Sequence, residues 1–296
     1  MKKYYDLIVV MPIGPRSDID FIKDTIDSLA HYTSCSYKLI LADDSQEGTG
    51  PAVKELFPAA DVLCTVKPMG GWAGLYITLA WAYRHALENY GFRLLLKLDT
   101  DALVVGYEPQ REAFDLFERD ERMGIAGQYP FEYSGKAWDI GWPRDRVLNG
   151  ATTWRYIKRP IANYAMRRLY LQAVQHGYLA GESVFGGAYF MSRSLLSSLY
   201  EKQLLPNLVL GRLNMGEDHL FALLARSAGF KLGDLSSGQL PFGCAWKGLP
   251  ASPEELSARG KKIIHSTRFW ENMNEQSIRA YFKAKRAAHA INKAIL

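Results

Sequence analysis

The chain has 296 residues, of which 48% are hydrophobic and 23% are charged, a composition typical of globular proteins. This length suits one large α/β domain or two small ones. No apolar stretch reaches the ~18–20 residues of a membrane span. The N-terminal segment lacks the long apolar region and cleavage site of a signal peptide, so we interpret it as a first strand. Three widely spaced cysteines predict neither a zinc cluster nor a disulfide framework and favour a reducing, cytoplasmic setting.

The net charge of +5 is unevenly distributed along the chain. From Lys261 to the C-terminus there are eight Lys or Arg and two Glu, a balance of +6 that leaves about −1 for residues 1–260. The basic character therefore belongs to the C-terminal segment. This pattern argues against a general nucleic-acid-binding protein.

The first hundred residues alternate between apolar strands and amphipathic helices. Strands are predicted at 6–12, 37–45, 61–66 and 92–98, with a helix capped by Ser17 after the first and another after the glycine-rich turn at 68–74. This alternation predicts a mostly parallel, doubly wound sheet. Ligands bind at the carboxyl ends of the strands in such sheets, and acids and glycines gather at those ends here.

The second half of the chain is less regular. Residues 128–182 combine tryptophans and tyrosines with basic residues, and a helix is predicted between Pro160 and Gly177. A strand entered through a glycine pair is predicted at 183–193. The segment 214–235 predicts a helix with acids in its first turn, which ends at Gly229 and is followed by a strand.

The fourth predicted strand ends in two carboxylates, Asp99 and Asp101. Residues i and i+2 of a strand point to the same side, with Cα atoms about 6.5–7 Å apart. Two such carboxylates can share one divalent ion, and hard oxygen ligands favour Mg²⁺ or Mn²⁺. The alternative is a strand that ends in an ordinary polar turn. An aspartyl-phosphate phosphatase is disfavoured because its D-x-D pattern follows the first strand.

Several segments together resemble the glycosyltransferases of the GT-A fold, in their inverting, family-2-like form. The resemblance covers residues 6–128 and 183–268 and rests on the segments IVVMPIGP, YKLILADDS, LKLDTDA, GGAYFMSR and MGEDHLF. It implies a Rossmann-like, three-layer α/β/α fold with a mostly parallel central sheet. It also implies one domain at 1–268, with a nucleotide-sugar-binding half at 1–127, an aromatic and basic insertion at 128–182 and an acceptor-binding half at 183–268. A basic C-terminal helix follows at 269–296.

The same resemblance implies a binding site for a nucleotide-diphosphate sugar, in most members a UDP-sugar, and for Mn²⁺ or Mg²⁺. Asp44, with Asp43 beside it, corresponds to the acid that reads the nucleobase. Asp101 corresponds to the metal ligand, Asp99 to a ligand of the ribose or of the metal's water shell, and His265 to a late histidine that returns to the metal. The remaining nucleotide-binding candidates are Pro12, Lys67, Gly70, Gly71, Thr100 and Lys247. The segment KPMGGWAGL departs from the Asn-x-Gly form that is commoner in the family.

The resemblance assigns the chemistry to Glu217 and Asp218. Asp218 corresponds to the general base of inverting members, which takes a proton from the acceptor hydroxyl as that hydroxyl attacks the anomeric carbon. Glu217 orients Asp218 or binds the acceptor. Two other readings stay open: both acids complement a helix N-terminus, or the enzyme is retaining and Asp218 binds the acceptor. For His265, the alternative to a metal ligand is a histidine with a purely structural role.

The sequence therefore predicts a metal-dependent glycosyltransferase that acts on a hydroxyl of a glycan or a lipid-linked glycan. One alternative is a sugar-nucleotide nucleotidyltransferase, which is disfavoured because PIGPRSD lacks the glycine-rich, basic signature of that class. Another is a non-catalytic protein that binds nucleotide sugars.

The C-terminal segment predicts a helix on which Arg279, Lys283, Arg286 and Lys293 fall within an arc of roughly 80°. Such an arc is typical of a helix that lies on anionic lipid, which would place a cytoplasmic enzyme at the inner face of a membrane. The alternative is a helix that packs on the body of the protein and turns its basic face to solvent.

Overall fold

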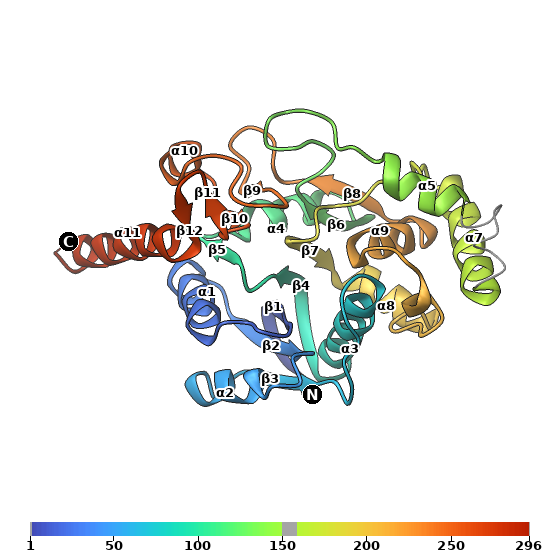
Figure 1. Cartoon of the computed structure of the whole chain (residues 1–296), viewed down its shortest axis with the longest axis horizontal. Helices are drawn as coiled ribbons and strands as arrows, with labels where there is room; N and C mark the ends of the chain where they lie inside the picture. The colour runs from blue at the N-terminus through green and yellow to red at the C-terminus, as the bar shows by residue number, and fades with distance from the viewer. Residues whose placement is uncertain (1, 150–158, 296) are drawn as a thin grey trace.

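The computed structural model describes residues 2–149 and 159–295, with side chains as far as residue 288 (Figure 1). Its helices are α1 (Ile19–Tyr32), α2 (Thr49–Leu56), α3 (Ala73–Asn89), α4 (Arg111–Arg119), α5 (Gly141–Asn149), α7 (Pro160–Gln175), α8 (Arg193–Glu201), the 3-10 turn η1 (Leu210–Arg212), α9 (Glu217–Ser227), α10 (Pro253–Ala258) and α11 (Glu275–Ile295). Its strands are β1 (Lys3–Ile13), β2 (Tyr37–Asp43), β3 (Asp61–Cys64), β4 (Tyr90–Leu98), β5 (Ala102–Val104), β6 (Met123–Gly127), β7 (Ala188–Ser192), β8 (Lys231–Asp234), β9 (Phe242–Cys244), β10 (Ile263–His265), β11 (Phe269–Trp270) and β12 (Met273–Asn274).

The central sheet has the strand order β3-β2-β1-β4-β7-β6-β8. Strands β3, β2, β1 and β4 run parallel, as do β6 and β8. Strand β7 is antiparallel to both of its neighbours, β4 and β6. The predicted mixed α/β architecture with a mostly parallel sheet is confirmed, and the first four predicted strands are β1 to β4.

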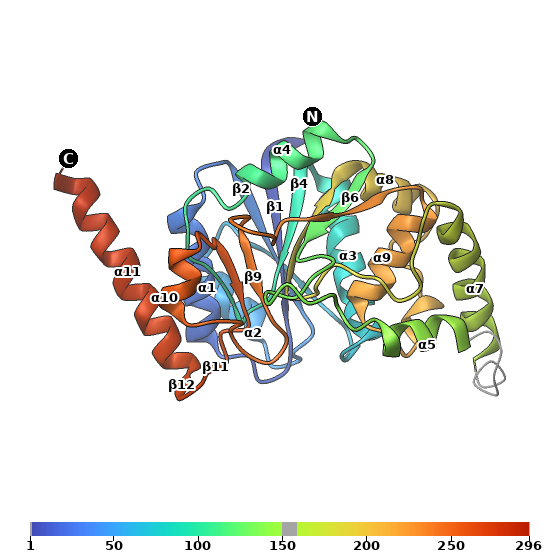
Figure 2. The same ribbon diagram turned by 90° about the horizontal axis from the view of Figure 1, so that it is seen from above.

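Helices cover both faces of this sheet (Figure 2). Side chains alternate along β1, so that Ile8 and Val10 pack in the cluster that includes α3, α8 and α9. Leu7 and Val9 point to the other face and pack in the cluster that includes α1 and α4. The strand period of two thus divides the apolar run into two buried faces, as a parallel sheet requires.

A second, three-stranded sheet lies beside the carboxyl end of β4. Its order is β5-β10-β9, and its register places His265 of β10 opposite both Ala102 of β5 and Cys244 of β9. Because Ala102 directly follows Asp101, this pairing brings a late part of the chain to the acidic end of β4.

The N-cap prediction for the first helix was wrong by one residue. Asp18 is the N-cap of α1, and its carboxylate accepts hydrogen bonds from the backbone N–H groups of Asp20 and Phe21. The Ser17 hydroxyl instead donates to the carbonyl of Gly14. A carboxylate also complements the positive end of the helix dipole, which a hydroxyl does less well.

The segment 128–182 contains α5 and α7, and its residues 150–158 lie outside the described part of the chain. The predicted helix between Pro160 and Gly177 is confirmed as α7. Its buried side chains include Met166 and Leu169, which pack in the same cluster as α9. Nearer the sheet, the ring of Trp138 stacks on Phe185 at 5.5 Å between centroids.

Two of the three described residues of the basic arc predicted for the C-terminal helix are buried. Arg279 and Arg286 are only 4% and 7% exposed, because both guanidinium groups pair with Asp24 of α1. Lys283 is exposed, and Lys293 lies among the side chains outside the described residues. The arc is therefore largely the docking face of α11. Within the described residues, no helix has the length and apolarity needed to cross a membrane.

Candidate metal and nucleotide site

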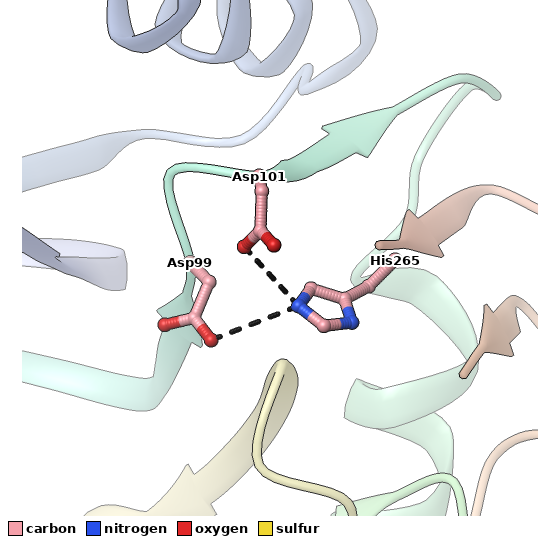
Figure 3. Close-up of side chains that lie close together, drawn as sticks. All are labelled: Asp99, Asp101 and His265. Carbon is pink, nitrogen blue, oxygen red and sulfur yellow. Dashed lines mark ion pairs between the residues drawn. The ribbon is translucent and has the colours of Figure 1, made fainter. Parts of the chain in front are cut away.

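Asp99, Asp101 and His265 converge at the carboxyl end of β4 (Figure 3). One ligand atom from each of the three side chains lies within 4.8 Å of the other two. The Nε2 atom of His265 is 3.2 Å from Oδ1 of Asp101 and 3.9 Å from Oδ2 of Asp99. The structure thus brings together the three residues that the sequence analysis assigned to a metal.

Local backbone contacts fix the two aspartates. The backbone N–H of Asp99 donates to the carbonyl of Gly187 at 3.0 Å, which extends the pairing of β4 with β7 by one step. The carbonyl of Asp101 accepts from both the N–H and the hydroxyl of Thr267, at 2.9 and 3.0 Å. The turn that carries both acids is therefore held from two sides.

The glycine pair at the entrance to β7 allows this close approach. A Cβ atom on Gly187 would lie 2.5 Å from Cγ of His265, and one on Gly186 would lie 2.9 Å from Oε1 of Glu217. Both distances are shorter than real Cβ contacts allow. The pair is required here because the histidine and the acids of α9 pack directly against the backbone.

The electrostatics of the site keep Asp101 ionised. Burial alone would raise its pKa, but His265 and Arg268 hold the pKa of Asp101 well below its usual range. Burial lowers the pKa of His265, but Asp101, Asp99 and the carbonyl of Ala245 together outweigh burial, so the net pKa is raised. The hydroxyl of Ser266 and Nε of Arg268 both donate to Oδ2 of Asp101, each at 2.9 Å.

The donor set fits a divalent metal. The Nδ1 atom of His265 lies 3.0 Å from the carbonyl of Ala245, an acceptor that favours the tautomer with its proton on Nδ1. In the neutral ring, Nε2 then points its lone pair at the aspartates, which is the arrangement found behind metal-bound histidines. The two carboxylates are ligands suited to Mn²⁺ and Mg²⁺, and the imidazole is a ligand for a transition metal such as Mn²⁺.

A buried lysine that the sequence analysis missed links the metal candidates to α9. Lys97 is 0% exposed, and its ammonium lies 2.6 Å from Oδ1 of Asp99 and 3.6 Å from Oε1 of Glu217. It also donates to the carbonyl of Gly186. Lys97 precedes Asp99 by two residues, so the strand period that aligned the aspartates could also have identified the lysine.

Burial acts on both partners of Lys97. It raises the pKa of Glu217 to about 8, although Lys97 acts in the opposite direction. It raises the pKa of Asp99 as well, again against Lys97. Burial would lower the pKa of Lys97 itself, but Asp99 and Glu217 outweigh it and keep the ammonium protonated.

We expect Lys97→Met to lower the free energy of unfolding by about 3–5 kcal/mol, because it leaves a buried carboxylate without its cation. Urea unfolding at pH 7 measures this difference. The matched control is Lys23→Met, which breaks the exposed Lys23–Asp27 pair of α1 and should cost about 0–1 kcal/mol. Equal losses for the two variants would contradict the role of Lys97.

Asp218 stands in the first turn of α9 and is partly exposed, with 20% of its side chain accessible. Its Oδ1 atom accepts from the backbone N–H of His219 at 2.8 Å. In residues 2–149 and 159–295, the nearest cationic atom recorded for it is Nε2 of His219, at 4.0 Å. Asp218 also lies against Gly186, whose added Cβ would be 3.4 Å from the Asp218 Cβ. The two acids of the predicted pair thus differ in accessibility. Glu217 is buried beside Lys97, and Asp218 is partly exposed.

The two acids at the end of β2, Asp43 and Asp44, accept hydrogen bonds from donors of this chain. Asp43 is 3% exposed and accepts from the N–H groups of Ser45 and Gly50, both at 2.8 Å. Asp44 is 7% exposed and accepts from Thr65 and from the N–H groups of Met69 and Gly70. In this structure Asp44 fastens the glycine-bearing loop, and its assignment to a nucleobase stays a prediction.

The other nucleotide-binding candidates differ in accessibility. Lys67, Gly70 and Gly71 lie exposed on the loop before α3, whereas Pro12 is buried in β1. The carbonyl of Thr100 accepts hydrogen bonds from Arg279 and Thr25. Lys247 is exposed, with its ammonium 5.2 Å from the ring centroid of Trp246.

A groove of about 610 Å³ lies between the loop fastened by Asp44 and the segment that leads into α9. Trp72, Arg159 and Arg212 are among the residues that line it, and its described lining contains no Asp or Glu. The ring of Trp72 is 54% exposed and lies 5.1 Å from that of Trp142. The groove therefore offers an aromatic face and positive charge beside the segment that leads into α9.

Comparison with known proteins finds no matching family model and no matching curated protein. Among solved structures, residues 1–349 of S. aureus TarS are similar, with a TM-score of 0.46 and 15% identity, over 78% of this chain and 58% of that chain. The mannosyltransferase PcManGT from Pyrobaculum calidifontis, in complex with GDP-Man and Mn²⁺, has a TM-score of 0.46 and 13% identity, over 99% of this chain and 66% of the other. Glucosyl-3-phosphoglycerate synthase from Mycobacterium tuberculosis, with Mn²⁺, UDP and phosphoglyceric acid, has a TM-score of 0.41 and 17% identity, over 78% and 68%.

The chain thus spans less than two thirds of the length of the first two structures. Similarity of this strength does not assign an activity, a donor or an acceptor. The chemistry has to follow from the side chains at the end of β4.

Proposed function

We propose that this protein is a metal-dependent glycosyltransferase that moves a sugar from a nucleotide diphosphate, in the first instance a UDP-sugar, to a hydroxyl group. The observation that carries the proposal is the convergence of Asp99, Asp101 and His265, from two distant parts of the chain, beside the acids of α9. The resemblance of the sequence motifs to GT-A glycosyltransferases supports it independently. We propose the same division at 1–127, 128–182 and 183–268, followed by the helix at 269–296.

The proposed metal ligands are Asp99, Asp101 and His265. A divalent cation held by them would stabilise the negative charge that develops on the departing nucleoside diphosphate. Asp101 supplies a permanent negative charge, since its pKa lies below its usual range. Lys97 fixes Asp99 from behind and joins it to the backbone at Gly186.

Asp218 is the proposed general base. Its carboxylate is partly open, and among the side chains that the structure describes its one cationic neighbour is His219. Glu217 is less suited to this role. Burial raises its pKa to about 8, and its carboxylate lies 3.6 Å from the ammonium of Lys97. Proton removal by Asp218 as the acceptor attacks from the face opposite the nucleotide corresponds to inversion. In a retaining enzyme, Asp218 would bind the acceptor.

The groove beside Trp72 is the proposed entrance for the acceptor, a glycan or a lipid-linked glycan. Aromatic rings bind the apolar faces of sugars, and Arg159 and Arg212 suit an acceptor that carries a phosphate or a carboxylate. Because α11 turns Arg279 and Arg286 inward, a membrane-bound acceptor is not required by the basic C-terminal segment.

Calorimetry with UDP tests the proposal. We expect binding in the presence of Mn²⁺ and much weaker binding in EDTA, because the diphosphate is held chiefly through the cation. Absence of metal-dependent binding at millimolar UDP and GDP would overturn the proposal. Binding without transfer or donor hydrolysis would identify a non-catalytic nucleotide-sugar-binding protein, and release of pyrophosphate from a nucleoside triphosphate would identify a nucleotidyltransferase.

A further inference from the structure

The turn between the two aspartates is held from its outer side by residues outside the ligand set. The carbonyl of Thr100, the residue between Asp99 and Asp101, accepts from Nη2 of Arg279 at 2.8 Å and from the Thr25 hydroxyl at 3.0 Å. Arg279 belongs to α11, 179 residues further along the chain. The C-terminal helix therefore contacts the metal-binding turn itself.

The guanidinium of Arg279 is almost fully used in this contact. Its Nη1 donates to the carbonyl of Phe21, to Oδ2 of Asp24 and to the Thr25 hydroxyl, at 3.2, 3.2 and 3.1 Å. Its Nε donates to Oε1 of Glu275 at 2.9 Å. Only 5% of the side chain is accessible. The planar fork of arginine can reach helix α1, helix α11 and the turn at once, which the single ammonium of lysine cannot do.

A second path joins α11 to the same turn. The Thr267 hydroxyl lies 3.0 Å from both Oε1 of Glu275 and the carbonyl of Asp101, and its single proton is shared between these two acceptors. The carbonyls of two consecutive residues, Thr100 and Asp101, are thus connected to α11. Backbone carbonyls are strong acceptors, and tying both of them restricts the rotation of the turn that aims the Asp101 carboxylate.

We propose that Arg279 is a positioning residue of the metal site, and that docking of α11 on α1 sets the geometry of the turn at residues 99–101. This inference rests on the proposed function only in taking these acids as metal ligands. Residues behind the ligands of metal sites typically influence metal affinity by 10–100-fold. The basic C-terminal segment is then part of the site.

The chain offers a matched control in Arg286. It lies on the same face of α11, it is equally buried, and it pairs with the other oxygen of the same Asp24 carboxylate. None of its recorded contacts reaches Thr100 or Asp101. Replacing either arginine removes an ion pair with Asp24, but only replacement of Arg279 releases the turn.

The experiment compares Arg279→Met, Arg279→Lys and Arg286→Met in the full chain. Mn²⁺ affinity is measured by the electron paramagnetic resonance signal of free Mn²⁺, and exchange of the amide hydrogens of residues 100–102 is followed without metal. We expect Arg279→Met to weaken Mn²⁺ binding about 10–100-fold and to speed exchange, with Arg286→Met within about threefold of wild type. Arg279→Lys should fall between them, and it serves as the test if Arg279→Met does not fold.

Equal effects of the two methionine variants on Mn²⁺ affinity and on exchange would overturn the positioning role, as would no effect of either. If the wild-type protein binds no Mn²⁺, the proposed metal site fails. The exchange measurement then still decides whether Arg279 orders the turn. Failure of this inference with intact Mn²⁺ binding by all variants leaves the proposed function in place.

Discussion

Asp101→Asn should weaken Mn²⁺ binding by at least about 100-fold, since loss of an outer partner of a ligand alone costs 10–100-fold. The substitution keeps the shape of the side chain and removes its charge. Asp101 is the acid that His265 and Arg268 keep ionised. A neighbouring carboxylate could take its place as a metal ligand only with a change of protonation or position. Metal-dependent binding of UDP and transfer activity should fall together with the affinity for Mn²⁺.

The matched control for this variant is Asp120→Asn. Asp120 is an acid at the surface that pairs with Lys231, away from the turn at residues 99–101. It should leave Mn²⁺ affinity unchanged. Circular dichroism and the melting temperature show whether each variant is folded. Retention of wild-type Mn²⁺ affinity by a folded Asp101→Asn protein would remove Asp101 from the ligand set.

Asp218→Asn should lower kcat of sugar transfer by about 10²–10⁴-fold, the usual contribution of a general base. Binding of UDP with Mn²⁺ should be unchanged, because Asp218 is not among the three clustered ligands. The two variants therefore distinguish two functions of the site. Asp101→Asn should lose binding of the metal and the nucleotide, and Asp218→Asn should lose only turnover. Steady-state kinetics and calorimetry on the same preparation measure both quantities.

Asp20→Asn controls for a purely structural effect of Asp218. Asp20 also stands in the first turn of a helix, α1, where an acid complements the helix dipole. Stability losses of similar size in the two variants, without loss of turnover in Asp218→Asn, would show that Asp218 serves only the helix. The configuration of the product at early times, read by NMR, distinguishes inversion from retention.

The arrangement of α11 changes how the charge of the sequence should be understood. An excess of Lys and Arg after residue 260 is typical of a segment that meets an anionic partner. Here the partner of Arg279 and Arg286 is Asp24 of the same chain. The helical period correctly placed the basic residues on one face, but the period of a helix carries no information about what that face contacts.

Features that depend on local periodicity could be predicted from the amino-acid sequence alone. The strand period of two aligned Asp99 with Asp101, and it could equally have aligned Lys97 with them. Apolar spacing placed α1 and α3, and start and end signals placed α7 and α9. The glycine pair at 186–187 identified the entrance to β7. These predictions succeed because a side chain's direction within one element follows from the backbone repeat alone.

Which of these elements contact one another depends on the tertiary structure. Pairing of β10 with β5 brought His265 to the aspartates, folding of the loop at 65–70 closed Asp44 onto backbone N–H groups, and docking of α11 turned Arg279 inward. Each outcome depends on partners far along the chain. A buried charge is stable only where another part of the fold supplies its counter-charge or hydrogen bonds, and no local pattern reveals that partner.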